Sequence, residues 1–133
     1  MVNYERKILW NDCIDDNKVL MIKQKQGFYG FPKGHIEEKE TEIETAIRET
    51  KEETDIDVII DSQMRFTMQY IINQNILKEV VYFIARPLNK KIVIQESELL
   101  DAFWIDINKV EELLTYENLK ELWRKVLAKM DKI

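Results

Sequence analysis

The sequence predicts one domain that contains both helices and strands. Apolar residues recur at helical spacing in two stretches, one after Thr41 and one near the C-terminus, and short apolar or β-branched runs typical of strands fill the rest. The chain has 133 residues, of which 45% are hydrophobic and 34% are charged. This length and composition are typical of a globular domain and exclude a disordered chain. We therefore expect a single domain over residues 1–133.

Five segments of the sequence are typical of strands. They are apolar or alternate apolar with polar residues, and they cover residues 18–24, 56–60, 64–72, 76–85 and 102–105. Only Asn73 to Asn75 separate 64–72 from 76–85, which predicts a hairpin with its turn at these residues. Pro87 is expected to close the second strand of that hairpin.

Two helices are expected. Thr41 followed by Glu44 is a capping-box signature, in which each side chain satisfies a backbone N–H at the start of a helix. The inner side of this helix is expected to carry Ile43, Ala46, Ile47, Thr50 and Thr54. Apolar residues at helical spacing predict a second helix near the C-terminus. We interpret this apolar stripe as a core-packing face rather than a partner-binding face. This stripe consists of Leu119, Leu122, Trp123, Val126, Leu127 and Met130.

Charge and cysteine content exclude several classes of protein. The net charge of −5 argues against general DNA or RNA binding, because phosphate backbones are held by an excess of Lys and Arg. No apolar stretch approaches the roughly 20 residues of a membrane helix, and the N-terminus lacks the apolar segment of a signal peptide. Cys13 is the single cysteine and cannot form an internal disulfide. We therefore expect a cytoplasmic protein with no DNA or membrane partner.

Three glutamates of the first helix fall on one patch. Glu49, Glu52 and Glu53 are spaced by three and four residues, and like charges at this spacing destabilise a helix. One interpretation is a solvated helix face that Arg48 and Lys51 partly neutralise. The other is a site for a hard cation such as magnesium or manganese, which clustered oxygen ligands suit.

The segment before this helix favours the cation site. Residues 27–35, GFYGFPKGH, hold all three glycines and the only histidine of the chain. A glycine turn beside the acidic patch would place backbone N–H groups and Lys33 next to the metals. The pattern therefore predicts a site where a cation bridges carboxylates to substrate phosphates.

From Gly34 to Ile56 the sequence resembles the Nudix box, G-x5-E-x7-R-E-U-x-E-E-x-G-U, in which U is a bulky aliphatic residue. The matching residues are Gly34, Glu40, Arg48, Glu49, Glu52, Glu53 and Ile56. Thr50 stands where an aliphatic residue is usual, although its methyl group can still pack. Asp55 replaces the glycine that ends the helix, and Asp tolerates a left-handed backbone better than most residues. Neither departure changes a proposed ligand.

The resemblance extends to the Nudix branch that cleaves diadenosine tetraphosphate asymmetrically. The similar segments are FPKGHIE, KEVVYFIA, ESELLDAFWIDI and TYENLKELW. Tyr29 and Phe28 depart from this branch, which commonly carries Trp at the first position and can carry His at the second. The resemblance implies a fold of the α/β (α+β) class, the Nudix fold, an α/β/α sandwich with a mixed curved β-sheet between helices.

The resemblance also implies a metal site. Magnesium, with manganese as the alternative, would be bound by Glu49, Glu52, Glu53 and the carbonyl of Gly34. Arg48 would orient a glutamate through a salt bridge. Glu40 would organise the loop and the helix.

Further residues are candidates for substrate contacts. The resemblance implies that Lys33 and Lys78 neutralise phosphate charge and that Tyr82 adds a hydroxyl donor. His35 is interpreted as a scaffold or a substrate contact rather than a base. For Tyr116 two interpretations stay open, stacking on a purine ring or packing of the last helix.

The box alone does not assign the catalytic base, since family members differ. The candidates are Glu53 and Glu98, with Glu96 as a near alternative to Glu98. Together with Arg48 and Glu49, the first two form the predicted catalytic set.

The sequence thus predicts metal-dependent hydrolysis of a pyrophosphate bond in a nucleoside diphosphate linked to another group. The favoured substrate is diadenosine tetraphosphate, cleaved to ATP and AMP. The alternatives are an RNA 5′-pyrophosphohydrolase, a nucleoside triphosphate pyrophosphohydrolase and a nucleotide-binding module without turnover. With Glu53 taken as an exposed carboxylate, Glu53→Gln is expected to remove activity and leave folding intact.

Overall fold

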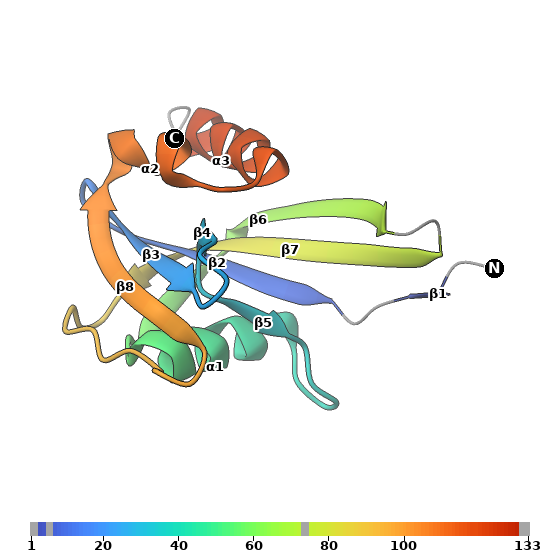
Figure 1. Ribbon diagram of the computed structural model, residues 1–133, viewed down its shortest axis with the longest axis horizontal. Coiled ribbons are helices and arrows are strands. Elements are labelled where there is room, and N and C mark those ends of the chain that lie inside the picture. The colour runs from blue at the N-terminus through green and yellow to red at the C-terminus, as the bar shows by residue number, and fades with distance from the viewer. Residues whose placement is uncertain (1–2, 5–6, 73–74, 131–133) are drawn as a thin grey trace.

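The computed structural model describes residues 3–4, 7–72 and 75–130. These residues form a mixed sheet of eight strands with helices on both faces (Figure 1), which confirms the expected α+β sandwich. The strands are β1 (Asn3–Tyr4), β2 (Ile8–Asp15), β3 (Lys18–Gln24), β4 (Tyr29–Gly30), β5 (Lys33–His35), β6 (Val58–Ile72), β7 (Ile76–Pro87) and β8 (Leu99–Asp106). The helices are α1 (Glu42–Thr54), η1 (Ile107–Lys109), α2 (Val110–Leu113) and α3 (Glu117–Met130).

The centre of the sheet is the pair β2 and β7. These two strands run parallel, with Trp10 opposite Tyr82. β3 and β5 pair antiparallel with β2, β6 pairs antiparallel with β7, and β8 pairs antiparallel with β3. β5 places Lys33 opposite Trp10 and Gly34 opposite Leu9, so neighbouring residues of β5 serve opposite faces of the sheet.

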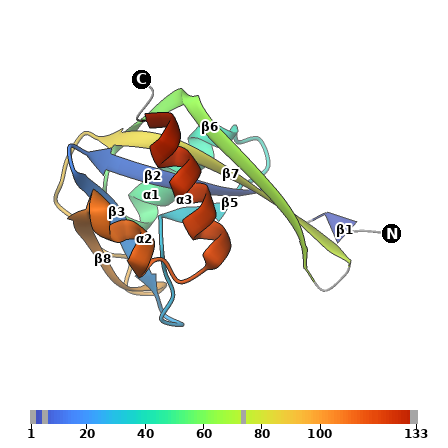
Figure 2. The ribbon, with the colours of Figure 1, turned by 90° about the horizontal axis from the view of Figure 1, so that it is seen from above.

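The β6–β7 hairpin is longer than the sequence predicts. The segments 56–60 and 64–72 were expected as two strands, but β6 is one strand of 15 residues with an irregularity between Asp61 and Arg65. The irregularity absorbs the polar residues that interrupt the apolar pattern. The hairpin projects beyond the rest of the molecule (Figure 2). Asn73 and Gln74 of the predicted turn lie outside the described residues.

Most of the other expected elements are present. The expected 18–24 strand is β3, the 102–105 strand is the centre of β8, and β7 ends at Pro87. The sequence analysis missed β2, because its sequence ILWNDCID places two polar residues inside an apolar run. Both polar residues, Asn11 and Asp12, are buried.

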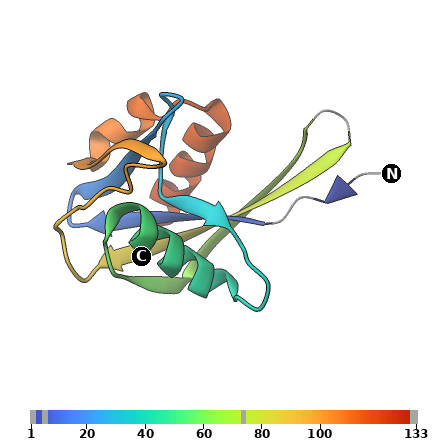
Figure 3. The ribbon, with the colours of Figure 1, turned by 60° about the horizontal axis from the view of Figure 1, so that its bottom comes forward.

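The two faces of the sheet carry separate cores. On the α3 face, Trp10, Phe31 and Tyr82 pack against Trp123 and Val126 of α3. The predicted stripe of the C-terminal helix is therefore confirmed as core. On the α1 face a smaller cluster forms from Leu9, Ala46, Val81 and Phe83. Figure 3 shows α1, in green, across the sheet beside β5.

α1 begins and ends as its sequence predicts. The capping box is complete, with the Glu44 N–H donating to Thr41 Oγ1 over 3.1 Å and the Thr41 N–H donating to Glu44 Oε1 over 2.9 Å. Asp55 ends the helix in the left-handed conformation, with φ of 62°. Two burial expectations were wrong. Ile47 is 36% exposed, whereas Glu53, expected to be exposed, is 4% exposed because the loop before β8 and the strand β5 cover it.

Asp12 is an anomaly of the α3-facing side. It is 0% exposed, and neither carboxylate oxygen has a hydrogen-bond partner among the described residues. Burial raises the pKa of Asp12 well above its ordinary value. The buried hydroxyl of Tyr82 and indole N–H groups of Trp10 and Trp123 also lack partners there.

No helix within the described residues is both long enough and apolar enough to cross a bilayer.

Candidate active site

A cleft of about 650 Å³ opens where β5 meets α1, with the β3–β4 turn and the loop before β8 on its other sides. Its volume suits a nucleotide-sized ligand. The lining residues are Ile8, Gln24, Lys25, Gln26, Lys33, Gly34, His35, Glu37, Arg48, Glu49, Glu52, Glu53, Lys78, Ser97, Glu98 and Leu99. Most of the residues that the sequence analysis singled out therefore meet in one place.

Gly34 allows α1 to approach β5 closely. A Cβ atom at this position would overlap the carboxylate of Glu49. A side chain at position 34 would therefore push the helix away or displace Glu49 from the cleft. The need for glycine here is steric, and it ties the first residue of the box to the first of its three clustered glutamates.

Glu49, Glu52 and Glu53 form the acidic wall of the cleft, and Arg48 contacts two of them. Its Nε donates to Glu40 Oε2 over 2.6 Å and its Nη1 donates to Glu49 Oε1 over 2.7 Å. Its Nη1 also lies 3.3 Å from Glu52 Oε2, and its Nη2 donates to the His35 carbonyl over 3.3 Å. The hydrogen bond from Arg48 lowers the pKa of Glu40 to about 2. These contacts connect the loop before α1 to the helix.

Glu53 is the most buried carboxylate of the cleft. The backbone N–H of Lys33 donates to its Oε1 over 2.8 Å. Burial, with Glu49 and Glu98 nearby, nevertheless raises the pKa of Glu53 to about 8. The pKa of Glu49 is also raised, first by burial, against the opposing effect of Arg48. Burial, and to a smaller extent the neighbouring carboxylates, thus disfavour the charged forms of Glu49 and Glu53.

The chemistry of this wall fits a divalent cation. Glu49, Glu52 and Glu53 offer only oxygen ligands, and a bound cation would offset the burial and the mutual repulsion that raise the pKa values of Glu49 and Glu53. Within the described residues no three acidic, histidine or cysteine side chains already surround one point as metal ligands. Arg48 pairs with two of the three glutamates instead, so a bound cation would share them with the guanidinium.

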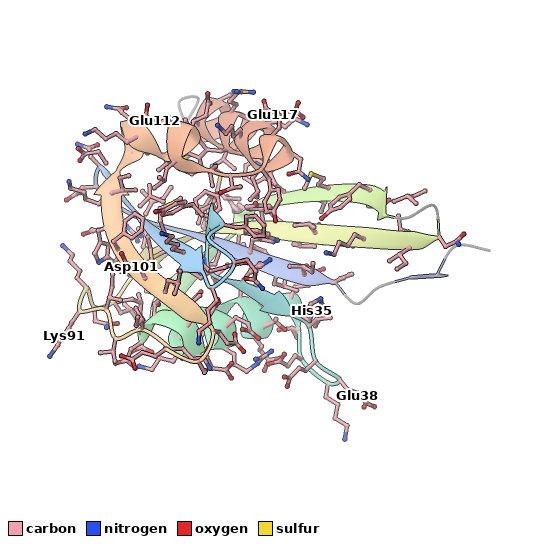
Figure 4. The ribbon with its side chains drawn as sticks, in the orientation of Figure 1. His35, Glu38, Lys91, Asp101, Glu112 and Glu117 are labelled. Atoms are coloured by element: carbon pink, nitrogen blue, oxygen red, sulfur yellow. The ribbon has the colours of Figure 1, made fainter. Side chains whose placement is uncertain are left out.

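Three basic side chains, called the basic wall below, also line the cleft. Lys33, His35 and Lys78 line it, and Lys33 Nζ lies 4.8 Å from the centre of the Trp10 ring. Burial and then the charge of Lys78 lower the pKa of Lys33. Figure 4 shows His35 at the end of β5 and Glu38 at the tip of the loop that leads to α1. The cleft is therefore lined by both acidic and basic side chains.

The two predicted tyrosines lie away from the cleft lining. Tyr82 is 1% exposed and stacks on Trp10, with ring centres 5.5 Å apart and planes 13° apart. Its strand alternates faces so that Tyr82 enters the α3-facing core, and the structure does not bring its hydroxyl to the cleft. Tyr116 is 42% exposed and lies against Phe28, with ring centres 5.1 Å apart.

Glu98 reaches the cleft from a loop that is bound to the end of α1. The Gln95 N–H donates to the Glu53 carbonyl over 3.0 Å, and the Glu98 N–H donates to the Gln95 carbonyl over 3.0 Å. Glu98 lines the cleft, whereas its neighbour Glu96 does not. The two candidates for the base, Glu53 and Glu98, are thus held by one local network.

The sequence analysis missed Gln24, Lys25, Gln26 and Ser97 as cleft residues. The turn 24–28 is closed by the Gly27 N–H donating to the Gln24 carbonyl over 2.8 Å, with φ of 93° at Gly27. Gly27 was a signal for a turn at this position. The turn lies beside the acidic wall because β3 pairs with β8, and the sequence does not reveal this pairing.

Comparisons with known proteins agree with this fold. The NUDIX domain profile matches residues 12–127. The asymmetrical bis(5′-nucleosyl)-tetraphosphatase of Rattus norvegicus is 29% identical over 107 residues, which cover 76% of this chain and 72% of the rat protein. Nudix hydrolase 2 of Arabidopsis thaliana is 33% identical over 101 residues, covering 69% of this chain and 36% of that protein. A C. elegans Ap4A hydrolase in a binary complex superposes with a TM-score of 0.81 at 23% identity, over 97% of this chain and 100% of that one.

The chain therefore belongs to the Nudix family. It is a pyrophosphohydrolase, and its expected similarity to asymmetric diadenosine tetraphosphate hydrolases is confirmed. Nudix hydrolases generally use divalent metal ions and act on small nucleotide substrates.

Proposed function

We propose that this protein hydrolyses dinucleoside polyphosphates, with diadenosine tetraphosphate cleaved asymmetrically to ATP and AMP. The main support for this proposal is that acidic side chains of α1 and basic side chains of β5 and β7 line the same cleft. A polyphosphate chain needs cations on its phosphates and a positioned base near one of them. The similarity to asymmetric tetraphosphatases supports the choice of substrate.

The proposed metal ligands are Glu49, Glu52, Glu53 and the carbonyl of Gly34, with Mg²⁺ as the cation and Mn²⁺ as the alternative. The bound cation would neutralise charge on the phosphate oxygens and on the leaving group. Arg48 keeps Glu49 in place through the 2.7 Å hydrogen bond. The Lys33 N–H keeps Glu53 in place through the 2.8 Å hydrogen bond, so the wall is fixed from the sheet side as well.

The proposed phosphate contacts are Lys33, His35 and Lys78, which line the basic wall. Tyr82 does not belong to this set because its side chain is buried in the core. The exposed ring of Tyr116 and the half-buried ring of Phe28 lie together near the turn 24–28, and we propose that a purine ring of the substrate stacks there.

We propose Glu98 rather than Glu53 as the base that takes a proton from the attacking water. Glu98 is exposed and lines the cleft on a loop tied to α1 by backbone hydrogen bonds. Glu53 is buried, and one of its two oxygens already accepts the Lys33 N–H. This arrangement suits a ligand better than a group that exchanges protons with water.

Glu98→Gln tests the assignment of the base, with Glu96→Gln as the matched control on the same loop. We expect kcat to fall by about 10²–10⁴ in Glu98→Gln, the usual contribution of a general base. Glu96→Gln should keep wild-type kcat because Glu96 does not line the cleft. Wild-type kcat in Glu98→Gln would return the role of base to Glu53.

The substrate is tested by a panel of compounds incubated with the protein and Mg²⁺. The panel contains diadenosine tetraphosphate, nucleoside triphosphates, nucleotide sugars and RNA with a 5′-triphosphate. ATP plus AMP from diadenosine tetraphosphate, at the highest kcat/KM of the panel, is the expected result. Preferred turnover of RNA or of triphosphates would establish those alternatives, and tight nucleotide binding without turnover would establish a binding module.

We further propose that residues 1–133 act as one Nudix domain in the cytoplasm. The single sheet of the described residues supports the first part. The burial of the only cysteine, Cys13, which forms no disulfide, agrees with a reducing compartment.

A further inference from the structure

The direction in which the glutamates of the acidic wall point depends on the rotation of α1 relative to the sheet. A small rotation of α1 about its own axis would turn Glu49 and Glu53 away from the cleft. The apolar contacts of Ala46 with Leu9 and Val81 resist separation but specify rotation poorly, because hydrophobic burial is not directional. The rotation of α1 is therefore fixed by directional contacts, such as hydrogen bonds, near these glutamates.

One buried directional contact joins the sheet to the middle of α1. Asn11 of β2 donates from Nδ2 to Thr50 Oγ1 over 2.9 Å. The two residues are 1% and 0% exposed. Thr50 follows Glu49 directly and precedes Glu53 by three residues, so this hydrogen bond lies level with the acidic wall. At the other end of α1, Glu42 is held by partly exposed ion pairs instead.

The backbone of Asn11 fixes the opposite side of the cleft. Its N–H donates to the Pro32 carbonyl over 3.0 Å. The next residue, Lys33, donates its own N–H to Glu53 Oε1 over 2.8 Å. Asn11, Pro32, Lys33, Glu53 and Thr50 therefore form a closed ring of contacts, the Asn11 circuit, which connects β2, β5 and α1.

Packing alone does not account for an amide at position 11. The Thr50 hydroxyl already donates to the Ala46 carbonyl over 2.9 Å and needs no partner from the sheet. The Oδ1 atom of Asn11 is buried and has no hydrogen-bond partner among the described residues. A buried unpaired oxygen lowers stability, and an apolar side chain at this position would avoid it.

We propose that Asn11 is a positioning residue, which seats α1 through Thr50 so that Glu49 and Glu53 point into the cleft. It touches neither substrate nor cation. The inference rests on the proposed function, because it assigns Asn11 to the cation site of that same reaction. It also explains Thr50, which stands where the Nudix box usually has an aliphatic residue: here the helix is seated by a hydrogen bond.

The test compares Asn11→Leu with Thr54→Val. The control is matched, because Thr54 is equally buried in α1 and its hydroxyl donates to the Thr50 carbonyl over 2.6 Å, but it makes no hydrogen bond to the described strands of the sheet. For each protein the measurements are the Kd for Mn²⁺ by electron paramagnetic resonance, kcat and KM for diadenosine tetraphosphate, and the midpoint of thermal unfolding.

In Asn11→Leu we expect the Mn²⁺ Kd to rise and kcat to fall, each by about tenfold or more, as is typical when the support of a metal ligand is lost. KM for the nucleotide should change by less than about twofold, and the unfolding midpoint should stay at or above that of the wild type. Thr54→Val should keep the wild-type Mn²⁺ Kd. Asn11→Ala serves the same purpose if leucine prevents folding.

Thr50→Val and the double variant Asn11→Leu/Thr50→Val complete the cycle. Thr50→Val leaves the whole amide unpaired and should lower both stability and Mn²⁺ affinity. The double variant should regain stability but keep the weak Mn²⁺ binding.

Wild-type Mn²⁺ affinity and kcat in Asn11→Leu would overturn the proposal and leave the proposed function intact. The proposal would also be overturned if Mn²⁺ affinity and kcat fell in proportion to stability in every variant, Thr54→Val included, because Asn11 would then have only a packing role. Absence of Mn²⁺ binding and of nucleotide turnover in the wild type would instead refute the proposed function, and the positioning role with it.

Discussion

The helices α1 and α3 cover opposite faces of one sheet but attach to it in different ways. α3 buries Leu122, Trp123 and Val126 in a broad apolar core. The inner side of α1 is narrow and polar, with Thr45, Thr50 and Thr54 fully buried and Glu53 nearly so. α3 therefore contributes stability through buried apolar area, whereas α1 buries less apolar surface and carries the carboxylates that line the cleft.

The largest stability effect is expected on the α3 side. Trp123→Ala removes a side chain that is 1% exposed and packs against Phe31. We expect the free energy of unfolding to fall by about 3–5 kcal/mol, as for other buried aromatic residues. Urea unfolding measures this loss. Mn²⁺ affinity per folded molecule should stay near the wild-type value, and a large decrease would show that α3 also governs the cleft.

Glu53→Gln tests the opposite property of the α1 side. Activity should fall by roughly a hundredfold or more, because a charged ligand that stabilises the transition state is lost. Stability should not fall, since the Gln Oε1 can still accept the Lys33 N–H. Steady-state kinetics and circular dichroism measure the two effects, and near-wild-type activity would refute the proposed metal site.

The pH dependence of stability sharpens this prediction. The pKa of Glu53 is raised from an ordinary 4.5 to about 8, so the folded state holds its proton more tightly than the unfolded state. Its contribution is fully present below about pH 4.5 and is lost as pH rises to about 8. With a metal chelator present, Glu53→Gln should therefore melt above the wild type at pH 8.5 and close to it at pH 4. Added Mg²⁺ should raise the melting temperature of the wild type and narrow the difference.

The smallest change in stability is expected for Asp12→Asn, on the side of the sheet that faces α3. Burial raises the pKa of Asp12, so its contribution is also greatest at low pH and is lost as pH rises. Asn is neutral at every pH, and we expect it to raise the melting temperature at pH 8 by a few degrees, about 1 kcal/mol. Mg²⁺ should leave this difference unchanged, unlike that of Glu53→Gln. A difference that Mg²⁺ abolishes would place Asp12 in the cation site.

Local patterns in the sequence predicted the elements whose causes are local. Thr41 and Glu44 predicted the start of α1, because a capping box involves only four consecutive residues. The spacing of Glu49, Glu52 and Glu53 predicted one acidic patch, because helix geometry alone puts them together. The fold class and the family followed from the same short-range patterns and from the Nudix box.

Other expectations failed where distant segments meet. β2 was missed because Asn11 and Asp12 interrupt its apolar run, and their burial depends on α1 and α3 from later in the chain. Tyr82 was expected at the phosphates, but the pairing of β7 with β2 turns it into the core beside Trp10.

Local patterns in the sequence were therefore sufficient to predict most of the elements and the acidic patch, because helix capping and helix spacing depend on residues within a few positions of each other. The burial of Glu53 and the hydrogen bond from Asn11 to Thr50 became visible only in the folded chain. Each of these depends on chain segments that are tens of residues apart in sequence, and burial, pKa and hydrogen bonding arise only once those segments pack together.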